Sequence, residues 1–466
     1  MKRSLTVDIG TTAIKLGLFD EVGGTVLAAK LPTPAVPDAD GSVYDMPAVV
    51  GAIEAFVGTF TAEQRASLER IAFCGVGESG ALVDARCELR SPMVLWHDQR
   101  GAPWVEALSD ADRARVYAVT GLPAHANYGI GKAAWAVDRY GARDVAWLNI
   151  TEYLAAHLTG ERWSEYSLAS RTMALDLSTR TWSEEICALF GVPTSLFPPL
   201  RTALDGVPIA PEMAARLGVS YGVEVHVAGH DHMVGAHGAD LGVGQVLNST
   251  GTTEGLLLLR DHPDLSARAA SRKIAGGVSC DGRHATSFAS IPTGGAMFAF
   301  LQRFLGWDAA RLVGCLDDLA ERYERDAISL ARIPTVVPHL RGSPPPEKSP
   351  AARGAIGNLS VDTDSSDLVF GCFWAMATEM KRVLDLFDSE PSELRVIGPA
   401  SANRLWLQLK ADVLGHDIEV SAFPEMVSLG AQALASGEPG DWSRADPWTV
   451  PTDLARHDAL LSHGGV

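Results

Sequence analysis

Two stretches of the chain decide the fold: "TVDIGTTAIKLGLF" at residues 6–19 and "VLNSTGTTEGLLLL" at residues 246–259. In each, a short apolar run leads into Gly-Thr-Thr and a second apolar run follows, which predicts a β-hairpin. The two turns begin at Gly10 and Gly251, about half the chain apart. We therefore expect two halves that open with the same hairpin, an N-terminal domain over 1–244 and a C-terminal domain over 245–466.

Bulk composition narrows the class of protein. A chain of 466 residues with 47% hydrophobic content is too long for one ordinary core and indicates two domains. The net charge of −18 argues against a nucleic-acid partner, because binding phosphates requires a basic face. No run approaches the ~18 apolar residues of a membrane helix, and Asp8 interrupts the only apolar stretch near the start. The six cysteines form no CxxC pair. We expect a cytoplasmic protein with reduced thiols.

The remaining pattern alternates strands and helices, which predicts an α/β fold. Gly75–Gly80 matches GxGxxG, but a strand-like segment follows it where a dinucleotide-binding fold needs a helix, so we reject that interpretation. Further strands are expected at 25–32, 70–77, 81–85 and 393–401, and helices at 46–60, over most of 103–195, and at 367–387, 403–415 and 428–437.

The Gly-Thr-Thr segments are either ordinary hairpin turns or phosphate-binding turns, and the presence of two copies favours phosphate binding. A hairpin turn of this kind exposes backbone N–H groups and two hydroxyls, with no bulky side chain in the way of phosphate oxygens. Asp8 stands at the end of a predicted strand, where its carboxylate can hold Mg²⁺ through water, because Mg²⁺ prefers oxygen ligands and keeps much of its hydration. The second turn, at 251–253, would grip the same phosphates from the other side.

The segment 227–239, "VAGHDHMVGAHGA", places Asp231 between two histidines. His230 and His232 are two residues apart and would not share a helix face, which disfavours a metal site. Asp231 precedes a helical stretch and is a good N-cap. A carboxylate at a helix start beside phosphate loops can also accept the proton of an attacking hydroxyl, so cap and base are compatible. The small residues at 235, 236, 238 and 239 would permit close helix packing at a domain junction.

Two further loops stay open at this point. "LWHDQR" at 95–100 combines aromatic and polar side chains and is either a solvated loop or the edge of a pocket for a polyhydroxy compound. "PHLRGSPPPEKSPAARGA" at 338–355 is too long for a tight turn and is either a surface loop or a lid.

Taken in order, these segments resemble the FGGY carbohydrate kinases, in the actin/hexokinase/heat-shock-chaperone ATPase superfamily. The resemblance runs from "TVDIGTTAIKLGLFD" through "TGLPAHANYGIGKAAW", "LTGERWSEYSLASRTMALDLSTRTWSEE" and "HDHMVGAHGADLGVGQVLNSTGTTE" to "NRLWLQLKADVLGHDIEV" and "SLGAQALASG". It implies two ribonuclease-H-like (actin-like ATPase) domains around an interdomain cleft. ATP would lie mainly on the C-terminal domain and a sugar or polyol on the N-terminal domain.

The resemblance also implies roles for particular residues. Asp231 would be the general base, and Asp8 would help to hold Mg²⁺ through water. The nucleotide would contact the two hairpin turns and two later loops, through Thr11, Thr12, Lys15, Gly251, Thr252, Thr253, Gly294, Gly295, Ala400 and Asn403. The substrate would contact Glu78, Asp98, Asn127 and His232. A homodimer stays open.

Some positions depart from the family pattern. Many relatives have a Gly-Gly-Gly-type adenosine loop where this chain has Gly398-Pro399-Ala400-Ser401, and Pro399 removes an N–H, so the nucleotide preference stays open. Glu78 adds a carboxylate that would favour a neutral polyol, ketose or amino-bearing substrate over an acid sugar. The sequence names neither the sugar nor the hydroxyl. The alternatives are a catalytically reduced sugar-binding regulator and an ATP-driven conformational protein of the same superfamily.

Overall fold

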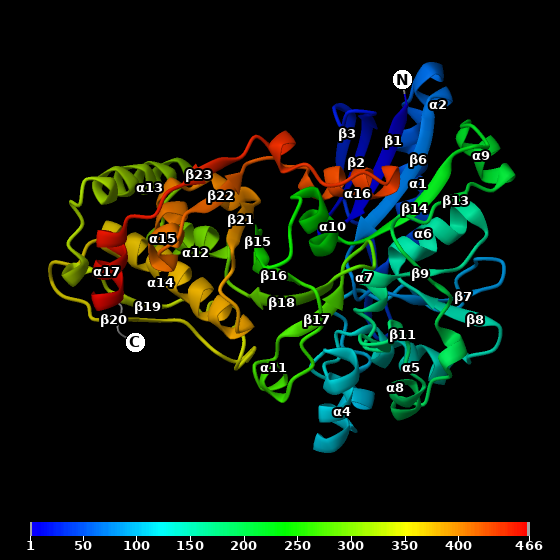
Figure 1. The fold of residues 1–466 in the computed structure, drawn as a ribbon, viewed down its shortest axis with the longest axis horizontal. Coiled ribbons are helices and arrows are strands. Elements are labelled where there is room, and N and C mark those ends of the chain that lie inside the picture. Colours follow the sequence, from blue (N-terminus) through cyan, green and yellow to red (C-terminus); the bar gives the residue numbers. More distant parts are fainter. Residues whose placement is uncertain (1, 464–466) are drawn as a thin grey trace.

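The computed structural model describes residues 2–463, which form two large β-sheets with helices around them (Figure 1). The first sheet has the strand order β13-β14-β6-β1-β2-β3. Its strands are β1 (Arg3–Ile9), β2 (Ala13–Asp20), β3 (Thr25–Pro32), β6 (Leu68–Gly75), β13 (Val207–Pro208) and β14 (Glu224–His230). The second sheet has the order β17-β18-β16-β15-β21-β22-β23. Its strands are β15 (Gln245–Thr250), β16 (Glu254–Arg260), β17 (Ala275–Val278), β18 (Ala285–Ile291), β21 (Glu393–Ile397), β22 (Ile418–Ser421) and β23 (Trp448–Val450).

The two sheets repeat one topology, and both predicted hairpins are present. β1 pairs antiparallel with β2 and parallel with β6, which in turn pairs parallel with β14. β15 pairs antiparallel with β16 and parallel with β21, which pairs parallel with β22. The central strands carry buried side chains on both faces, as the continuous apolar runs predict. The predicted boundary between 244 and 245 falls between the last strand of the first sheet and β15, and stays a prediction.

Helices cover the faces of both sheets (Figure 1), and the shorter strands pair with one another in separate two-stranded sheets. The helices are α1 (Met46–Gly58), α2 (Ala62–Ala66), α3 (Ala102–Glu106), α4 (Asp110–Thr120), α5 (Gly129–Tyr140), α6 (Ile150–Thr159), α7 (Tyr166–Ala169), α8 (Glu184–Leu189), α9 (Pro211–Leu217), α10 (Asp231–Gly238), α11 (Ala267–Ser271), α12 (Ala296–Leu305), α13 (Ala309–Glu324), α14 (Ser365–Leu384), α15 (Arg404–Leu414), α16 (Met426–Ser436) and α17 (Leu454–His463). The minor strands are β4 (Ala35–Asp38), β5 (Gly41–Tyr44), β7 (Ala81–Asp84), β8 (Val145–Leu148), β9 (Ser164–Glu165), β10 (Leu175–Asp176), β11 (Thr181–Trp182), β12 (Leu200–Arg201), β19 (Thr335–Val337) and β20 (Ala355–Gly357).

The structure confirms two sequence predictions about particular segments and adds two findings about the described residues. The GxGxxG segment connects β6 to β7 without a helix, so it is not a dinucleotide fingerprint. The helix expected at 428–437 is α16, which ends at Ser436 and is capped by Gly437 with left-handed backbone. All six cysteines are free. No helix within residues 2–463 is long and apolar enough to cross a membrane.

The two halves are joined by α10 and α16, which pack backbone against backbone. A Cβ atom at Gly430 would lie 2.1 Å from the carbonyl oxygen of Val234, and one at Gly238 would lie 2.5 Å from that of Met426. The close packing predicted for the small residues of α10 is therefore found at Gly238. α16 comes from the second half of the chain but lies beside the first sheet (Figure 1), where the side-chain amide of Gln432 donates to the carbonyl of Asp20 at 2.7 Å.

This contact predicts that Gly430→Ala is strongly destabilising, because the added methyl group meets backbone that cannot rotate away. We expect a loss of about 2 kcal/mol or more in the free energy of unfolding, measured by thermal and urea unfolding. The matched control is Gly314→Ala in α13, where a Cβ atom would have no neighbour within 4 Å. That control should be neutral or stabilise by up to about 1 kcal/mol. Equal behaviour of the two variants would contradict the account of the α10–α16 contact.

Candidate active site

Asp231 lies where β14 of the first sheet turns into α10. The structure corrects one prediction here: His230 takes the N-cap position, without a side-chain cap, and Asp231 is the first helical residue. Its Oδ1 accepts the N–H of the next residue, His232, at 2.7 Å. The carboxylate therefore satisfies a free N–H of the first turn from inside the helix instead of from the cap. Its side chain is 30% exposed, and burial raises its pKa above the ordinary value while His232 opposes the rise.

A buried polar pair holds the backbone just before Asp231. The N–H of His230 donates to Ser167 Oγ at 2.9 Å, and that hydroxyl donates to Glu165 Oε2. Gly229 has a φ of +117°, and a Cβ atom there would lie 2.4 Å from Ser167 Oγ. Only glycine allows this approach. Ser167 and Glu165 are thus positioning residues for the strand-to-helix turn. Sequence reasoning did not single them out, although both lie within the segment that resembles the family.

The two histidines beside Asp231 have different surroundings. His230 is buried, its Nε2 lies 3.2 Å from Asp231 Oδ1, and burial lowers its pKa well below the ordinary value, so the ring is neutral. His232 is about one-third exposed, and its ring packs against Phe288 of β18. Its Nδ1 lies 3.2 Å from Ser249 Oγ on β15. His232 therefore connects the Asp231 helix to the second sheet, and its proposed contact with substrate stays a prediction.

The first hairpin brings Asp8 and Lys15 together near Asp231. Lys15 Nζ lies 3.9 Å from Asp8 Oδ2 and 4.0 Å from Glu425 at the start of α16. Burial, followed by the nearby charge of Asp231, raises the pKa of Asp8 to about 7. Asp8 Oδ1 is buried and has no hydrogen-bond partner among the described residues. An orphaned carboxylate oxygen in this position fits a water-bound Mg²⁺ ion.

The second hairpin turn is the meeting point of two other loops. The N–H groups of Gly294 and Gly295 donate to the carbonyls of Thr252 and Gly251, at 3.0 and 2.7 Å. The loop at 398–403 also lies on this turn, because the N–H of Ala400 donates to Thr250 Oγ1 at 3.2 Å. The structure therefore gathers the nucleotide-side candidates of the second half around Gly251–Thr253, whose residues are exposed.

The loop that departs from the family pattern is built around Pro399. Gly398 has a φ of +97°, and Pro399 begins a short 3₁₀ helix (Pro399–Ala402), a position where its missing N–H is not needed. The proline therefore starts this turn instead of breaking it. Asn403 caps α15 through its Oδ1, while its Nδ2 is buried and has no partner among the described residues. That amide is a free donor beside the predicted nucleotide site.

A buried ion pair connects the second hairpin to α15. Lys410 of α15 and Glu254 of β16 are both fully buried, and Lys410 Nζ lies 2.5 Å from Glu254 Oε2. Asn248 of β15 bonds to both of them. Glu254 directly follows the Gly-Thr-Thr turn. The cluster therefore ties α15, behind the sheet, to both strands of the hairpin.

On the substrate side, the structure changes the interpretation of Glu78. Nε and Nη2 of the buried Arg171 donate to Glu78 Oε1, at 2.9 and 2.7 Å. The Glu78 charge is compensated, so the expected preference against acid sugars loses its basis. Arg171 Nη1 is buried and without a partner among the described residues, and the guanidinium lies over the Tyr128 ring. Arg171 is a site candidate that sequence reasoning missed, because it stands 93 positions from its partner.

The segment 95–100 is ordered by contacts on both sides. Both oxygens of Asp98 accept hydrogen bonds from Arg100, and Asn127 Oδ1 accepts one from Gln99. Buried Lys132 donates to the carbonyls of Glu78, Leu95 and Trp96, and burial lowers its pKa to about 7. Trp96 Nε1 donates to Thr11 Oγ1 at 2.9 Å. These contacts order the segment and connect it to the first hairpin turn, while His97 and Gln99 stay exposed. Its role as the edge of a substrate pocket stays a prediction.

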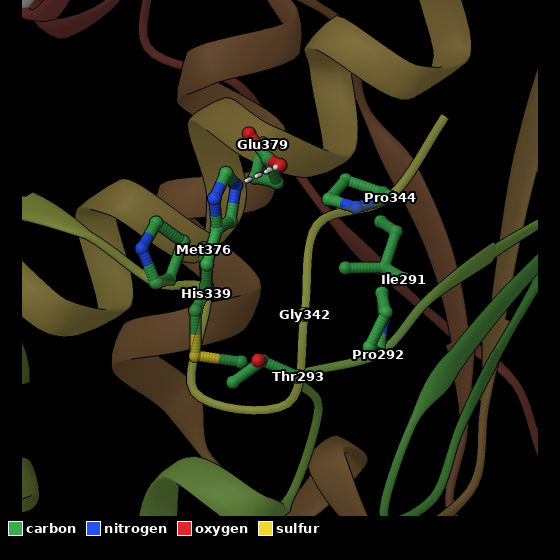
Figure 2. Close-up of a pocket in the computed structure, with 9 residues that line it drawn as sticks. Ile291, Pro292, Thr293, His339, Gly342, Pro344, Met376 and Glu379 are labelled. Atoms are coloured by element: carbon green, nitrogen blue, oxygen red, sulfur yellow. Dashed lines mark hydrogen bonds and ion pairs between the residues drawn. The ribbon is translucent and has the colours of Figure 1, made fainter. Parts of the chain in front are cut away.

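The proline-rich loop packs against the body of the second domain. Figure 2 shows the small pocket between this loop, the end of β18 and α14, lined by Ile291, Pro292, Thr293, Pro338, His339, Gly342, Pro344, Met376 and Glu379. His339 Nε2 lies 3.0 Å from Glu379 Oε1 across it (Figure 2). Residues 342–345 are buried. The middle of the loop is thus anchored to the second domain. The pocket includes Thr293, the residue before Gly294, and Asp231 does not line it.

Two duplicated sheets, each with a Gly-Thr-Thr hairpin, define a two-domain protein of the actin-like ATPase fold. Family models identify it further: the N-terminal domain of the FGGY family of carbohydrate kinases matches residues 4–238, and the C-terminal domain of that family matches residues 246–437. The chain therefore belongs to the FGGY family of carbohydrate kinases.

Individual relatives agree with this assignment. A glycerol kinase from Burkholderia vietnamiensis (strain G4 / LMG 22486) is 27% identical over 467 residues, covering 95% of this chain and 90% of the relative. A xylulose kinase from Lactobacillus acidophilus shares the fold with a TM-score of 0.87 at 18% identity, covering 99% of this chain and 96% of that one. A glycerol kinase from Plasmodium falciparum, solved with ADP, has a TM-score of 0.83 at 18% identity, covering 100% and 97%.

The raised pKa of Asp8 predicts that this carboxylate destabilises the free protein. The pKa of Asp8 is about 7 in the folded protein, against an ordinary value of 3.8. At a pH between these two values, Asp8 is therefore protonated in the folded state and ionised in the unfolded state. Stability is therefore lost as pH rises through that window. Asp8→Asn should raise the melting temperature more at pH 8 than at pH 5. The corresponding gain in the free energy of unfolding should be a few kcal/mol at most, since one pKa unit is about 1.4 kcal/mol.

The control for this prediction is Asp138→Asn, which changes an exposed carboxylate and should leave both melting temperatures unchanged. An Asp8→Asn variant that melts no higher than the parent at pH 8 would show that Asp8 carries no burial penalty.

The buried Lys410–Glu254 pair predicts a large effect of removing one partner. Lys410→Met leaves Glu254 buried without a counter-charge and should cost about 3–5 kcal/mol of unfolding free energy. Lys410→Met/Glu254→Gln should recover part of that loss. The matched control, Lys381→Met, removes the exposed pair with Asp385 and should cost less than about 1 kcal/mol. Equal losses in the two single variants, measured by urea unfolding, would refute the proposed role of the pair.

Proposed function

We propose that this carbohydrate kinase transfers the γ-phosphoryl group of ATP to a hydroxyl of a sugar or polyol, with Asp231 as the general base. The observation that carries the proposal is the place of Asp231: it starts the helix that joins the two Gly-Thr-Thr hairpin domains. Phosphoryl transfer depends on positioning and charge neutralisation more than on covalent chemistry. A carboxylate held by Ser167 and Glu165 through the preceding backbone meets the positioning requirement.

The environment of Asp231 suits a base. Burial raises its pKa toward the working pH, which increases its affinity for the hydroxyl proton while it stays ionised above that pKa. Its activity should therefore fall as pH drops through the raised pKa. His230 lies next to the carboxylate but is neutral, because burial lowers its pKa. It therefore adds no positive charge that would lower the pKa of Asp231. Neither neighbouring histidine is needed to take the proton.

The phosphate groups would lie between residues 10–12 and residues 251–253. Lys15 supplies a positive charge beside the first turn, and exposed N–H groups and hydroxyls line both turns. Asp8 and its unpartnered Oδ1 would hold hydrated Mg²⁺, which neutralises phosphate charge when bound. On the adenosine side, Gly294, Gly295, Ala400 and Asn403 remain our candidates, and the ADP complex of the Plasmodium relative supports a nucleotide in this fold.

The substrate would contact Glu78, Asp98, Asn127 and Arg171, with His232 nearby. The names of the relatives support a polyol or ketose. Because Arg171 compensates Glu78 and keeps a free Nη1 donor, an acid sugar belongs in the same test. A cytoplasmic location, the domain boundary and a homodimer stay predictions.

The proposal is tested by measuring ATP consumption and phosphorylated product with polyols, ketoses, aldonic acids and amino sugars. With the best acceptor, Asp231→Asn should lower kcat by about 10²–10⁴-fold, the usual worth of a general base, with a melting temperature close to that of the parent. The matched control is Asp240→Asn, just beyond the end of α10. Its φ of 49° is one that asparagine tolerates, and it should keep full activity.

An active Asp231→Asn variant would remove Asp231 from the chemistry. Acceptor binding without any phosphorylation of any compound would favour the reduced, sugar-binding regulator instead.

A further inference from the structure

His230, Asp231 and His232 form a compact group of potential metal ligands. One ligand atom from each residue can be chosen so that all of them lie within 4.8 Å of one another. Nε2 of His230 lies 3.2 Å, and Nε2 of His232 lies 4.0 Å, from the same Asp231 oxygen. Among residues 2–463, no other set of three histidine, cysteine or carboxylate side chains is gathered in this way.

The spacing argument against a metal site does not hold in three dimensions. That argument placed both histidines on one helix, where residues two apart point away from each other. His230 instead ends β14, and His232 lies in the first turn of α10. The change of direction between strand and helix turns both rings toward Asp231, with their centroids 5.2 Å apart.

Both rings are oriented by contacts at their other nitrogen. Nδ1 of His230 lies 3.0 Å from Met233 Sδ, and Nδ1 of His232 lies 3.2 Å from Ser249 Oγ. These contacts leave the two Nε2 atoms directed at Asp231. Metal-binding histidines are usually oriented by a hydrogen bond at the other ring nitrogen, which sets the tautomer. The Ser249 hydroxyl can supply such a partner to His232, and the Met233 thioether supplies a weaker one to His230.

We propose that His230, Asp231 and His232 bind a divalent transition-metal ion such as Zn²⁺ or Ni²⁺, and that the bound ion inhibits phosphoryl transfer by occupying Asp231. Two imidazole nitrogens and one carboxylate suit Zn²⁺ and Ni²⁺, whereas Mg²⁺ prefers oxygen ligands. Ligand atoms 3–5 Å apart can converge on an ion at about 2.0–2.2 Å through small side-chain rotations. The inhibition rests on the proposed role of Asp231, whereas the binding does not.

Binding is tested on untagged protein without nucleotide, by calorimetric titration with Zn²⁺ and by the visible absorption of added Co²⁺. We expect one site per chain. His232→Asn and Ser249→Ala should each weaken Zn²⁺ binding by about tenfold or more, because one removes a ligand and the other its orienting contact. The matched control, His237→Asn, changes a histidine on the same helix outside the cluster and should bind Zn²⁺ like the parent.

Absence of a Zn²⁺ site, or equal affinity in the parent and in His232→Asn, would overturn the proposal. His232 is partly exposed, so its replacement is compatible with folding, and unchanged melting temperatures verify this for each variant.

Inhibition is tested with Mg·ATP in excess and buffered free Zn²⁺. The ion should compete with the acceptor, and its inhibition constant should rise in Ser249→Ala by the same factor as the dissociation constant. Binding at the three residues without inhibition would leave the metal site standing and overturn the inhibitory role, and with it Asp231 as the base. Inhibition equal in parent and Ser249→Ala would place the inhibitory ion elsewhere.

Discussion

The contact between α10 and α16 is the constraint on which the rest of the structure depends. Glycines at 238 and 430 let the two backbones meet at distances that no other residue permits. Because α16 belongs to the second half of the chain and lies on the first sheet, this contact fastens the halves together next to the Asp231 helix. Asp231 begins α10, and Glu425, which faces Lys15, directly precedes α16. The helix pair therefore sets where the carboxylate lies relative to both hairpins.

Each of the two hairpins has a buried charged group beside it, and the two groups differ in how well their charge is compensated. The Lys410–Glu254 pair is fully enclosed and compensated, and it connects the second hairpin to α15. Asp8 is enclosed but only weakly compensated, since Lys15 lies 3.9 Å away while Asp231 raises its pKa. An uncompensated carboxylate in a folded protein is costly unless a ligand uses it. The uncompensated Asp8 is consistent with the Mg²⁺ site proposed at the first hairpin, whereas the buried pair behind the second hairpin is already neutralised within the protein.

Local patterns in the sequence were enough for the hairpins, the central strands, α14, α15, α16 and the glycine that ends α16. The candidate base could also be proposed from the sequence, because Asp231 stands at the start of a helix and near the second Gly-Thr-Thr. What could not be predicted depends on contacts between distant segments. The Arg171–Glu78 pair joins residues 93 positions apart in the sequence, and it removes the charge argument about the substrate. The grouping of His230 with His232 depends on a strand-to-helix turn, whose geometry residue spacing does not reveal. The packing of α16 on the opposite sheet left no periodic signal.

The central claim is that one helix junction holds a base between two phosphate-binding turns. The most direct measurement is a crystal structure with Mg²⁺, a non-hydrolysable ATP analogue and the best acceptor. We predict that the β- and γ-phosphate oxygens lie between residues 10–12 and 251–253, with the reacting hydroxyl hydrogen-bonded to the Asp231 carboxylate. Phosphates bound away from either turn, or a reacting hydroxyl that contacts a different base, would contradict the account.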